Sequence, residues 1–424
     1  MLAISLESNW WTPFRNVIFR WYRYTLRWVL RNYTKPAFVA GIGMTIVAAY
    51  IVFPTRPSDT RSTRIDKYTK GMLNTGNDCF ANATLQALAA LDQVVEYLTK
   101  FPRTTTPVPL HAALAMILRT LRQPVWTNES VSVWPFLRVL ERVHGGRISR
   151  SQQDAHELMQ LVMDTLETEH LRAVSAKYVA PSFPFSSVIE SRMSCVRCGG
   201  TSVPVRRPMM MWEVTVPHAS APLEDVLQRS WNEVIEGYAC VVCTVDHILL
   251  NRASVKMSSR EEEALLVKLQ GALAEGTLRI NDDVSDDPVY KSLVAMNSNV
   301  LPVKTVVHRR VSFVTKPKVL AVHLSRSLYS HEQSWRNRTS IGIPETLVFG
   351  NTVYTLKSMV RHQGSHSAGH YECYRRKPMF GKKRMVNKPF WRVSDTRVTE
   401  VKTQSVLKDV EGAYLLLYEQ TIST

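Results

Sequence analysis

Two Cys-x-x-Cys pairs constrain the fold of this chain most strongly. Cys195 and Cys198 form the first pair, Cys240 and Cys243 form the second, and 41 residues separate them. Disulfides or buried free cysteines explain two such pairs poorly in a chain of 424 residues, whereas four thiolates are a ligand set for tetrahedral zinc. Four protein ligands leave no open position, so we expect a structural Zn²⁺. The segment between the pairs, longer than in a compact zinc ribbon, is expected to form a long β hairpin.

Residues 37–53 are predicted to span a membrane. The stretch AFVAGIGMTIVAAYIVF is uncharged and lies between Pro36 and Pro54. As a helix it would be roughly 25 Å long, slightly less than the ~30 Å hydrocarbon core. A buried core helix is the alternative, but residues 10–35 are aromatic and basic, a composition that favours a membrane interface.

The net charge of +17 suggests nucleic acid, anionic lipid or an acidic partner. Residues 1–70 hold eleven Lys/Arg against Glu7, Asp59 and Asp66, almost half of the excess. The charge therefore gathers beside the predicted span, and we expect no nucleic-acid partner. Basic residues flank the span equally and do not orient it. Zinc-bound or reactive thiols need a reducing compartment, which places residues 55–424 in the cytosol.

From residue 71 onward the pattern is mixed and predicts an α+β domain, because strand-like runs cluster after the helices. We interpret residues 244–300 as an insertion, because they contain a charged helical stretch followed by an acidic, turn-rich stretch. Helical periodicity fits 79–100, 111–122 and 152–170. Strands are predicted at 186–193, 211–216, 303–315, 318–324, 352–361, 370–376, 390–394 and 412–418.

A single cysteine, Cys79, stands where a Gly/Asn-rich turn becomes an apolar helix. A helix amino terminus favours the thiolate, which is the nucleophile. Gly71 and Gly76 would let the backbone approach a substrate, and Asn74 is able to donate to an oxyanion. A lone cysteine is otherwise a small buried hydrophobe, so the interpretation needs a base elsewhere.

A base is available near the carboxyl terminus. His370 begins a strand-like run in GHYECYRR, and a neighbouring predicted strand, FWRVSDTRV, ends at Ser394 and Asp395. A cysteine at a helix start with a histidine and an orienting group on later strands is the pattern of nucleophilic thiol catalysis.

These motifs resemble the ubiquitin-specific proteases, which are papain-like cysteine deubiquitinases. GMLNTGNDCFANATLQAL is similar to their Cys box, SQQDAHELMQLVMDTL to their Gln-Gln-Asp box, and KVLAVHLSRS, YTLKSMVRHQGSHSAGHYECYRR and AYLLLYE to later strands and the His box. The resemblance covers residues 71–419 and implies a fingers–palm–thumb architecture. It also implies hydrolysis of isopeptide bonds after the carboxyl-terminal glycine of ubiquitin.

The resemblance assigns roles by position. Cys79 is the nucleophile, His370 the general base and acid, and Asn74 the oxyanion donor. Asp154 and Glu157 match acidic positions that contact the basic tail of ubiquitin, and as helix neighbours they would share a face. The four paired cysteines match the zinc-binding fingers. We expect two other histidines, His156 and His323, to be packed or surface residues rather than ligands.

Ser394 is a departure from the family pattern, which usually has Asp or Asn as the third triad member. A serine hydroxyl orients His370 without stabilising imidazolium by charge, so we expect Ser394 to hold His370 with Asp395 assisting or substituting. Asp78 stands where Thr is more common. Both departures leave open an alternative, a weak or inactive module that binds ubiquitin.

Serine at this position together with an amino-terminal span resembles the branch of the family anchored in the mitochondrial outer membrane. The Arg-rich, acid-poor amino terminus also resembles mitochondrial targeting information. We therefore expect this membrane, with the endoplasmic reticulum as the alternative. The expected organisation is a basic segment (1–36), a span (37–53), a linker (54–70) and a catalytic domain (71–419) with fingers at about 186–243.

Overall fold

The computed structural model describes residues 67–101, 107–148, 153–330, 333–364, 369–378, 389–408 and 410–421. The predicted span at 37–53 and the basic segment before it lie outside these ranges. No helix within the described ranges is both long and apolar enough to cross a membrane.

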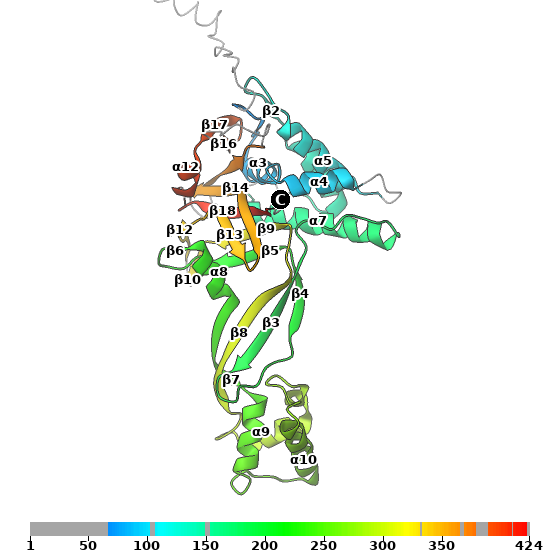
Figure 1. Cartoon of the computed structure of the whole chain (residues 1–424), viewed down its shortest axis with the longest axis vertical. Helices are drawn as coiled ribbons and strands as arrows, with labels where there is room; N and C mark the ends of the chain where they lie inside the picture. The colour runs from blue at the N-terminus through cyan, green and yellow to red at the C-terminus, as the bar shows by residue number, and fades with distance from the viewer. Residues whose placement is uncertain are drawn as a thin grey trace, which may run out of the picture. The chain divides into compact units, whose positions relative to one another are not determined.

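Five helices pack together on one side of the domain (Figure 1). They are α3 (Cys79–Leu88), α4 (Asp92–Lys100), α5 (Pro109–Arg122), α6 (Trp134–His144) and α7 (Ala155–Ser175). The single helix predicted at 79–100 is wrong, because the chain breaks at Leu91, which has an extended backbone (φ −89°, ψ 111°). No Gly or Pro marks this break, so the apolar pattern runs through it.

The apolar stripe of α5 shows why these helices pack as they do. Leu110, Leu114, Leu118 and Leu121 recur along one face and are all buried, as expected for an amphipathic helix against a core. Pro109 is the first helical residue, where its missing N–H costs nothing.

The helices lie against an eight-stranded sheet, the palm. Its order is β17-β16-β15-β14-β18-β9-β5, with β13 also paired to β14. Neighbours are antiparallel except β5 and β9. The central strand β18 is buried from Ala413 to Glu419, which explains its continuous apolar sequence. The bounds are β5 (Met211–Thr215), β9 (Val319–Ser325), β13 (Thr346–Phe349), β14 (Thr352–Gly364), β15 (Gly369–Arg376), β16 (Phe390–Ser394), β17 (Arg397–Val401) and β18 (Ala413–Gln420).

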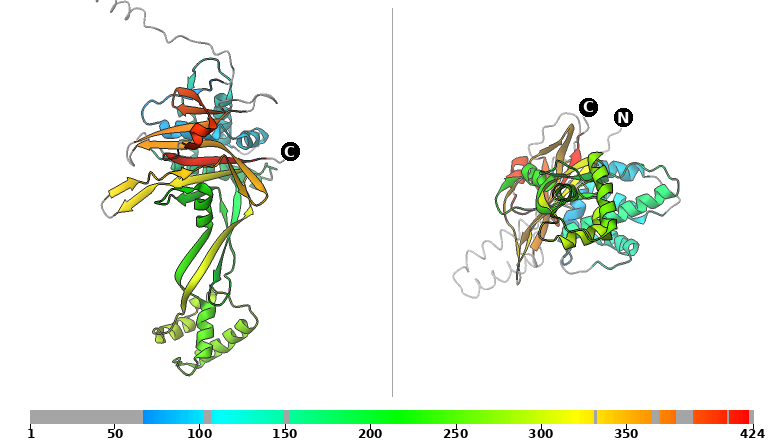
Figure 2. Two further views of the ribbon diagram at one scale, coloured as in Figure 1. Left: turned by 60° about the vertical axis from the view of Figure 1, so that its left-hand side comes forward. Right: turned by 90° about the horizontal axis from the view of Figure 1, so that it is seen from below.

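A second, four-stranded antiparallel sheet, the fingers, extends away from the palm (Figures 1 and 2). Its order is β4-β3-β8-β7. The single long hairpin expected between the cysteine pairs is wrong, because the chain returns to the palm through β5 and α8 (Leu223–Trp231) before β7 begins. The fingers strands are β3 (Ser187–Cys195), β4 (Val205–Met209), β7 (Asn232–Ala239) and β8 (Lys304–Thr315).

The predicted insertion forms a helical cap at the far end of the fingers (Figure 1). Its elements are α9 (Val241–Leu250), α10 (Arg260–Ala274), the 3₁₀ helix η1 (Asp283–Asp286) and α11 (Pro288–Met296). Ser259 begins α10 with a capping box to Glu262. Leu266, Leu269 and Leu293 of these helices share one buried core with three of the paired cysteines, which are Cys195, Cys240 and Cys243.

Short elements complete the described chain. They are the parallel pair β1 (Gly71–Met72) and β2 (Ser130–Val131), the parallel pair β6 (Ala221–Pro222) and β12 (Ile341–Gly342), the hairpin β10 (Ser327–Ser330) and β11 (Gln333–Arg336), and α12 (Thr403–Lys408).

A buried carboxylate joins α7 to the start of α5. Glu169 is 1% exposed and accepts hydrogen bonds from the backbone N–H groups of Leu110 and His111. It also lies 2.7 Å from His111 Nδ1, and Tyr97 Oη lies 2.8 Å from His111 Nε2. Glu169 therefore satisfies backbone donors at a helix terminus that α5 cannot satisfy itself.

We predict that Glu169→Ala lowers the free energy of unfolding by about 3 kcal/mol, because it leaves buried donors without an acceptor. Urea denaturation followed by circular dichroism measures the change. Glu96→Ala, on an exposed ion pair with Lys100, is the control and should leave the midpoint unchanged. Equal midpoints for the two variants would contradict a structural role for Glu169.

Candidate functional site

Cys79 is the first residue of α3 and is 4% exposed. The helix packs against β14, β15 and β16 of the palm. Its thiol lies against the backbone of Tyr371, the residue that follows His370 on β15. The fold therefore brings the predicted nucleophile beside the strand that begins with the predicted base, across almost 300 residues of sequence.

Burial raises the pKa of the Cys79 thiol, and the negative charge of Asp395 raises it further. A backbone hydrogen bond from Tyr371 lowers the pKa but does not reverse the direction. Burial therefore opposes the effect of the helix terminus, which was expected to favour the thiolate.

His370 and Ser394 come together from adjacent strands. His370 Nε2 lies 2.8 Å from Ser394 Oγ, since β15 pairs with β16 and Ser394 ends the latter strand. This contact holds the ring through one nitrogen, Nε2. The hydroxyl supplies orientation without negative charge.

Asp395 makes different contacts from those expected. Its Oδ2 accepts from Asn74 Nδ2 at 2.9 Å, and its Oδ1 accepts from Asn82 Nδ2 at 2.8 Å. Asp395 sits in the tight turn between β16 and β17 with φ +50°, a conformation that Asp and Asn tolerate better than most residues. The carboxylate is thus bound to the segment around Cys79, and Ser394 is the residue that contacts His370.

Both the oxygen and the nitrogen of the Asn74 side-chain amide form hydrogen bonds. Its Oδ1 accepts from the backbone N–H groups of Gly76 and Asp78, each at 3.1 Å. Asp395 takes one Nδ2 hydrogen, and no acceptor among the described residues takes the other. Asp78 is buried, and its Oδ2 accepts from the backbone and hydroxyl of Thr75 and from Trp134 Nε1. These bonds fix the turn that precedes Cys79.

Sequence reasoning missed Asn82 and misread Gly71. Asn82 lies three residues after Cys79 and is 2% exposed, so a buried amide in an apolar helix was the available signal. Gly71 was expected to admit substrate. Instead, a Cβ at Gly71 would lie 2.8 Å from the backbone of Asp395 and Thr396, so the glycine allows close packing of the β16–β17 turn.

The predicted substrate-binding acids lie at the start of α7. Asp154 is the N-cap of the helix, with extended backbone, and its Oδ1 accepts from the N–H of His156 at 2.6 Å. Its Oδ2 accepts from Tyr414 Oη at 2.5 Å. Glu157 is exposed in the first turn. The two acids were expected to share one face of the helix. Asp154 instead precedes the helix as its N-cap, and of the two only Glu157 lies within the helix.

A cleft of about 790 Å³ lies between α7 and the base of the fingers. Gln160 and Glu167 of α7 line one side, and Arg207, Met209 and Arg309 of the fingers are among the lining residues. Burial raises the pKa of Glu167, and the negative charge of Asp164 adds to that effect. The cleft offers both apolar and charged side chains to a binding partner.

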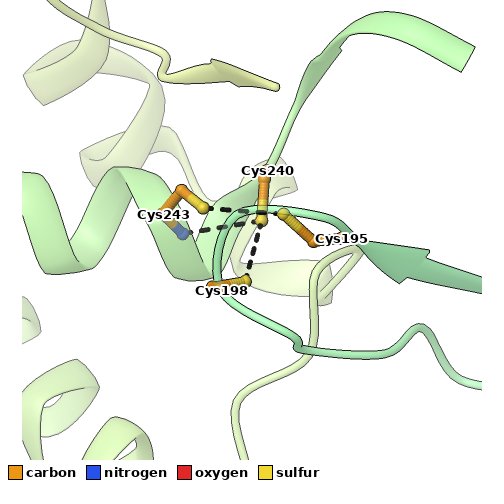
Figure 3. Close-up of side chains that lie close together, drawn as sticks. All are labelled: Cys195, Cys198, Cys240 and Cys243. Carbon is orange, nitrogen blue, oxygen red and sulfur yellow. Dashed lines mark hydrogen bonds between the residues drawn. The ribbon is translucent and has the colours of Figure 1, made fainter. Parts of the chain in front are cut away.

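The two cysteine pairs converge at the end of the fingers (Figure 3). The sulfurs of Cys195 and Cys243 are 3.7 Å apart, and those of Cys198 and Cys240 are 3.8 Å apart. Four thiolates at 2.3 Å around tetrahedral zinc lie about 3.8 Å from each other. The distances and the ligand chemistry therefore fit a zinc ion, which these four residues would hold.

Backbone N–H groups point at two of these sulfurs. The N–H of Gly200 donates to Cys198 Sγ at 3.4 Å, and that of Cys243 donates to Cys240 Sγ at 3.5 Å. Such donors stabilise thiolate charge around a metal. A zinc ion there would join the β3 end of the fingers to α9 and so to the helical cap.

Comparison with known proteins gives a consistent result. A family model described as ubiquitin carboxyl-terminal hydrolase matches residues 70–418. Ubiquitin carboxyl-terminal hydrolase 16 of Saccharomyces cerevisiae is 28% identical, covering 84% of this chain and 90% of its own length. Ubiquitin carboxyl-terminal hydrolase 11 of Schizosaccharomyces pombe is 27% identical, covering 90% of this chain and 92% of its own length.

A solved structure supports the same fold. The SAGA Ubp8/Sgf11/Sus1/Sgf73 DUB module bound to ubiquitin aldehyde aligns over 90% of this chain and 75% of that chain, with a TM-score of 0.57 and 16% identity. The family match and the relatives' names bear on function as well as fold. The chain belongs to the ubiquitin carboxyl-terminal hydrolase family and is a cysteine-type deubiquitinase.

Proposed function

We propose that Cys79 and His370 hydrolyse the isopeptide bond after the carboxyl-terminal glycine of ubiquitin. The observation that carries the assignment is the 2.8 Å contact between His370 Nε2 and Ser394 Oγ, on strands that also pack against the helix of Cys79. This contact holds the imidazole in one orientation, and the next residue on the same strand, Tyr371, contacts the Cys79 thiol through its backbone.

The chemistry follows the acyl-transfer sequence. His370 takes the proton from Cys79 Sγ, and the thiolate attacks the glycine carbonyl carbon. The free hydrogen of Asn74 Nδ2 and the backbone N–H groups at the start of α3 stabilise the oxyanion. His370 then protonates the leaving lysine amine, which leaves a thioester. Water, deprotonated by His370, cleaves the thioester and releases ubiquitin.

Ubiquitin is the proposed partner, and two features support its placement. Glu157 is exposed at the start of α7, where it is able to pair with a basic tail. The 790 Å³ cleft between α7 and the fingers is open to a folded partner. The similar SAGA module was solved with ubiquitin aldehyde bound.

Full-length protein is expected to cleave ubiquitin that carries a carboxyl-terminal fluorogenic amide. Cys79→Ser should lower kcat/KM at least roughly 10³-fold, because the weaker nucleophile keeps its proton. Glu157→Gln should raise KM by roughly fivefold through a lost ion pair. Glu275→Gln, on the distal cap, is the control. Undiminished turnover by Cys79→Ser would contradict the assignment.

We propose that Ser394 orients His370 and that Asp395 positions Asn74. Ser394→Ala should lower kcat by roughly tenfold to a hundredfold with little change in KM, since orientation of the base is lost. Asp395→Asn keeps the φ of the turn but loses the charge and one acceptor oxygen. It should lower kcat by roughly a hundredfold, as for a misplaced oxyanion donor. No loss in Ser394→Ala would contradict this role for Ser394.

We propose that Cys195, Cys198, Cys240 and Cys243 bind one structural Zn²⁺. Atomic emission should find one zinc per chain, and Cys198→Ser should lose it and melt at a lower temperature. Arg197→Ala, an exposed neighbour on the same turn, should retain the metal. Equal zinc content in the two variants would exclude the four-cysteine site.

We also propose that residues 37–53 anchor the protein in the mitochondrial outer membrane, with the endoplasmic reticulum as the alternative. The support is the uncharged sequence and its basic, aromatic flank. Carbonate extraction of cells should leave the wild type in the membrane pellet. Two arginines, Met44→Arg and Ala48→Arg, should release it, since each costs about 3 kcal/mol in a span. Thr55→Arg is the control, and equal extraction of all three proteins would contradict a span.

A further inference from the structure

Two histidines and a glutamate from three elements meet beside the start of α7. His156 is the second residue of α7, Glu213 lies on β5, and His323 lies on β9. One possible ligand atom of each lies within 4.8 Å of the other two. Glu213 and His323 are direct neighbours in the parallel pairing of β5 with β9. The sequence had suggested only packed or surface histidines here.

His323 is the buried member of the group. It is 4% exposed, and neither ring nitrogen forms a hydrogen bond with any described residue. Nδ1 lies 3.4 Å from Glu213 Oε1, and the ring stacks on His156 at 3.8 Å. A buried polar ring without hydrogen bonds is costly and calls for a ligand or another explanation.

The ring nitrogens of His323 are donor atoms available to an ion, because they have no hydrogen-bond partner among the described residues. Imidazole is a ligand for zinc and related ions.

We propose that His156, Glu213 and His323 form a second metal site, which binds a divalent transition ion such as Zn²⁺. Two imidazoles and one carboxylate, completed by water, are a known zinc ligand set. An imidazole binds metal in its ring plane, so the stacked rings must tilt. His323 is fixed by packing, whereas His156 is half-buried and the Glu213 side chain is 59% exposed. Those two are free to turn toward the ion.

Charged groups of both signs lie near the proposed metal site. Arg336 is the positive group that acts on His323, and its guanidinium stacks over the ring of Tyr414. The carboxylates of Glu213 and Asp154 supply the compensating negative charge. An ion is able to enter from the 790 Å³ cleft, because Glu213 and Gln160, one turn after His156, both line it.

A metal at this site would tie the first turn of α7 to the palm. His156 adjoins Glu157 and follows the N-cap Asp154, which are the residues proposed to meet the ubiquitin tail. A metal would therefore restrict the movement of this turn. Its relevance to ubiquitin binding rests on the proposed function, whereas the metal site itself does not.

The test uses full-length protein with Cys79→Ala, which removes the active-site thiol as a competing ligand, and with the four-cysteine site loaded with zinc. Calorimetric titration with ZnCl₂ should show one further ion per chain. Titration with Co²⁺ should give d–d bands without thiolate charge-transfer bands, as nitrogen and oxygen ligands require. His156→Gln and Glu213→Gln should each weaken binding at least tenfold, and Glu275→Gln should not.

Absence of a further ion overturns the proposal. Binding that is unchanged in His156→Gln and Glu213→Gln means an adventitious ion only and overturns it as well. Thiolate charge-transfer bands from the added Co²⁺ also overturn it. The two substituted side chains reach the surface, so melting curves matching that of Glu275→Gln verify that folding is intact. Binding is measured without turnover, and failure of the proposed hydrolysis would therefore leave this result interpretable.

Discussion

The turn between β16 and β17 joins the two ends of the catalytic domain, and the active site depends on it. Asp395 accepts from the backbone N–H of Met72 through its carbonyl and from Asn74 and Asn82 through its carboxylate. The residue just before it, Ser394, contacts His370. One turn thus fixes the segment that carries the proposed nucleophile and the strand that orients the proposed base. Gly71 permits this closeness, since any side chain there would collide with the turn.

The local pattern of apolar residues was sufficient to predict helices and strands that are buried on one face or on all sides. The leucine stripe of α5 and the continuous apolar run of β18 both specified their elements. The break between α3 and α4 was not predictable, because the apolar periodicity continues through Leu91. The route of the fingers was also missed. Strand β7 pairs with β8, about 70 residues later in the chain. The hydrophobic pattern within a strand does not indicate which distant strand it pairs with.

The candidate active-site residues were identified from the sequence, but their contacts with one another were not. Cys79, His370 and the four paired cysteines follow from motif and spacing, and the family match covers them all. Ser394 contacts His370, whereas Asp395 contacts Asn74 and Asn82. This difference depends on the directions of two adjacent side chains at a tight turn, and the sequence does not determine those directions. The raised pKa of Cys79 likewise follows from burial by the assembled domain. The orientation of His370 is therefore central to the proposed mechanism, in which His370 takes the proton of Cys79.

The most direct test is capture of ubiquitin that bears a carboxyl-terminal electrophile by the full-length protein. The wild type should form a stable one-to-one adduct, which peptide mapping should place on Cys79 and which Cys79→Ala should not form. Both proteins should first be shown to be folded and zinc-loaded. An adduct on another cysteine, or none with the wild type, would contradict the account of Cys79 as a nucleophile activated by His370.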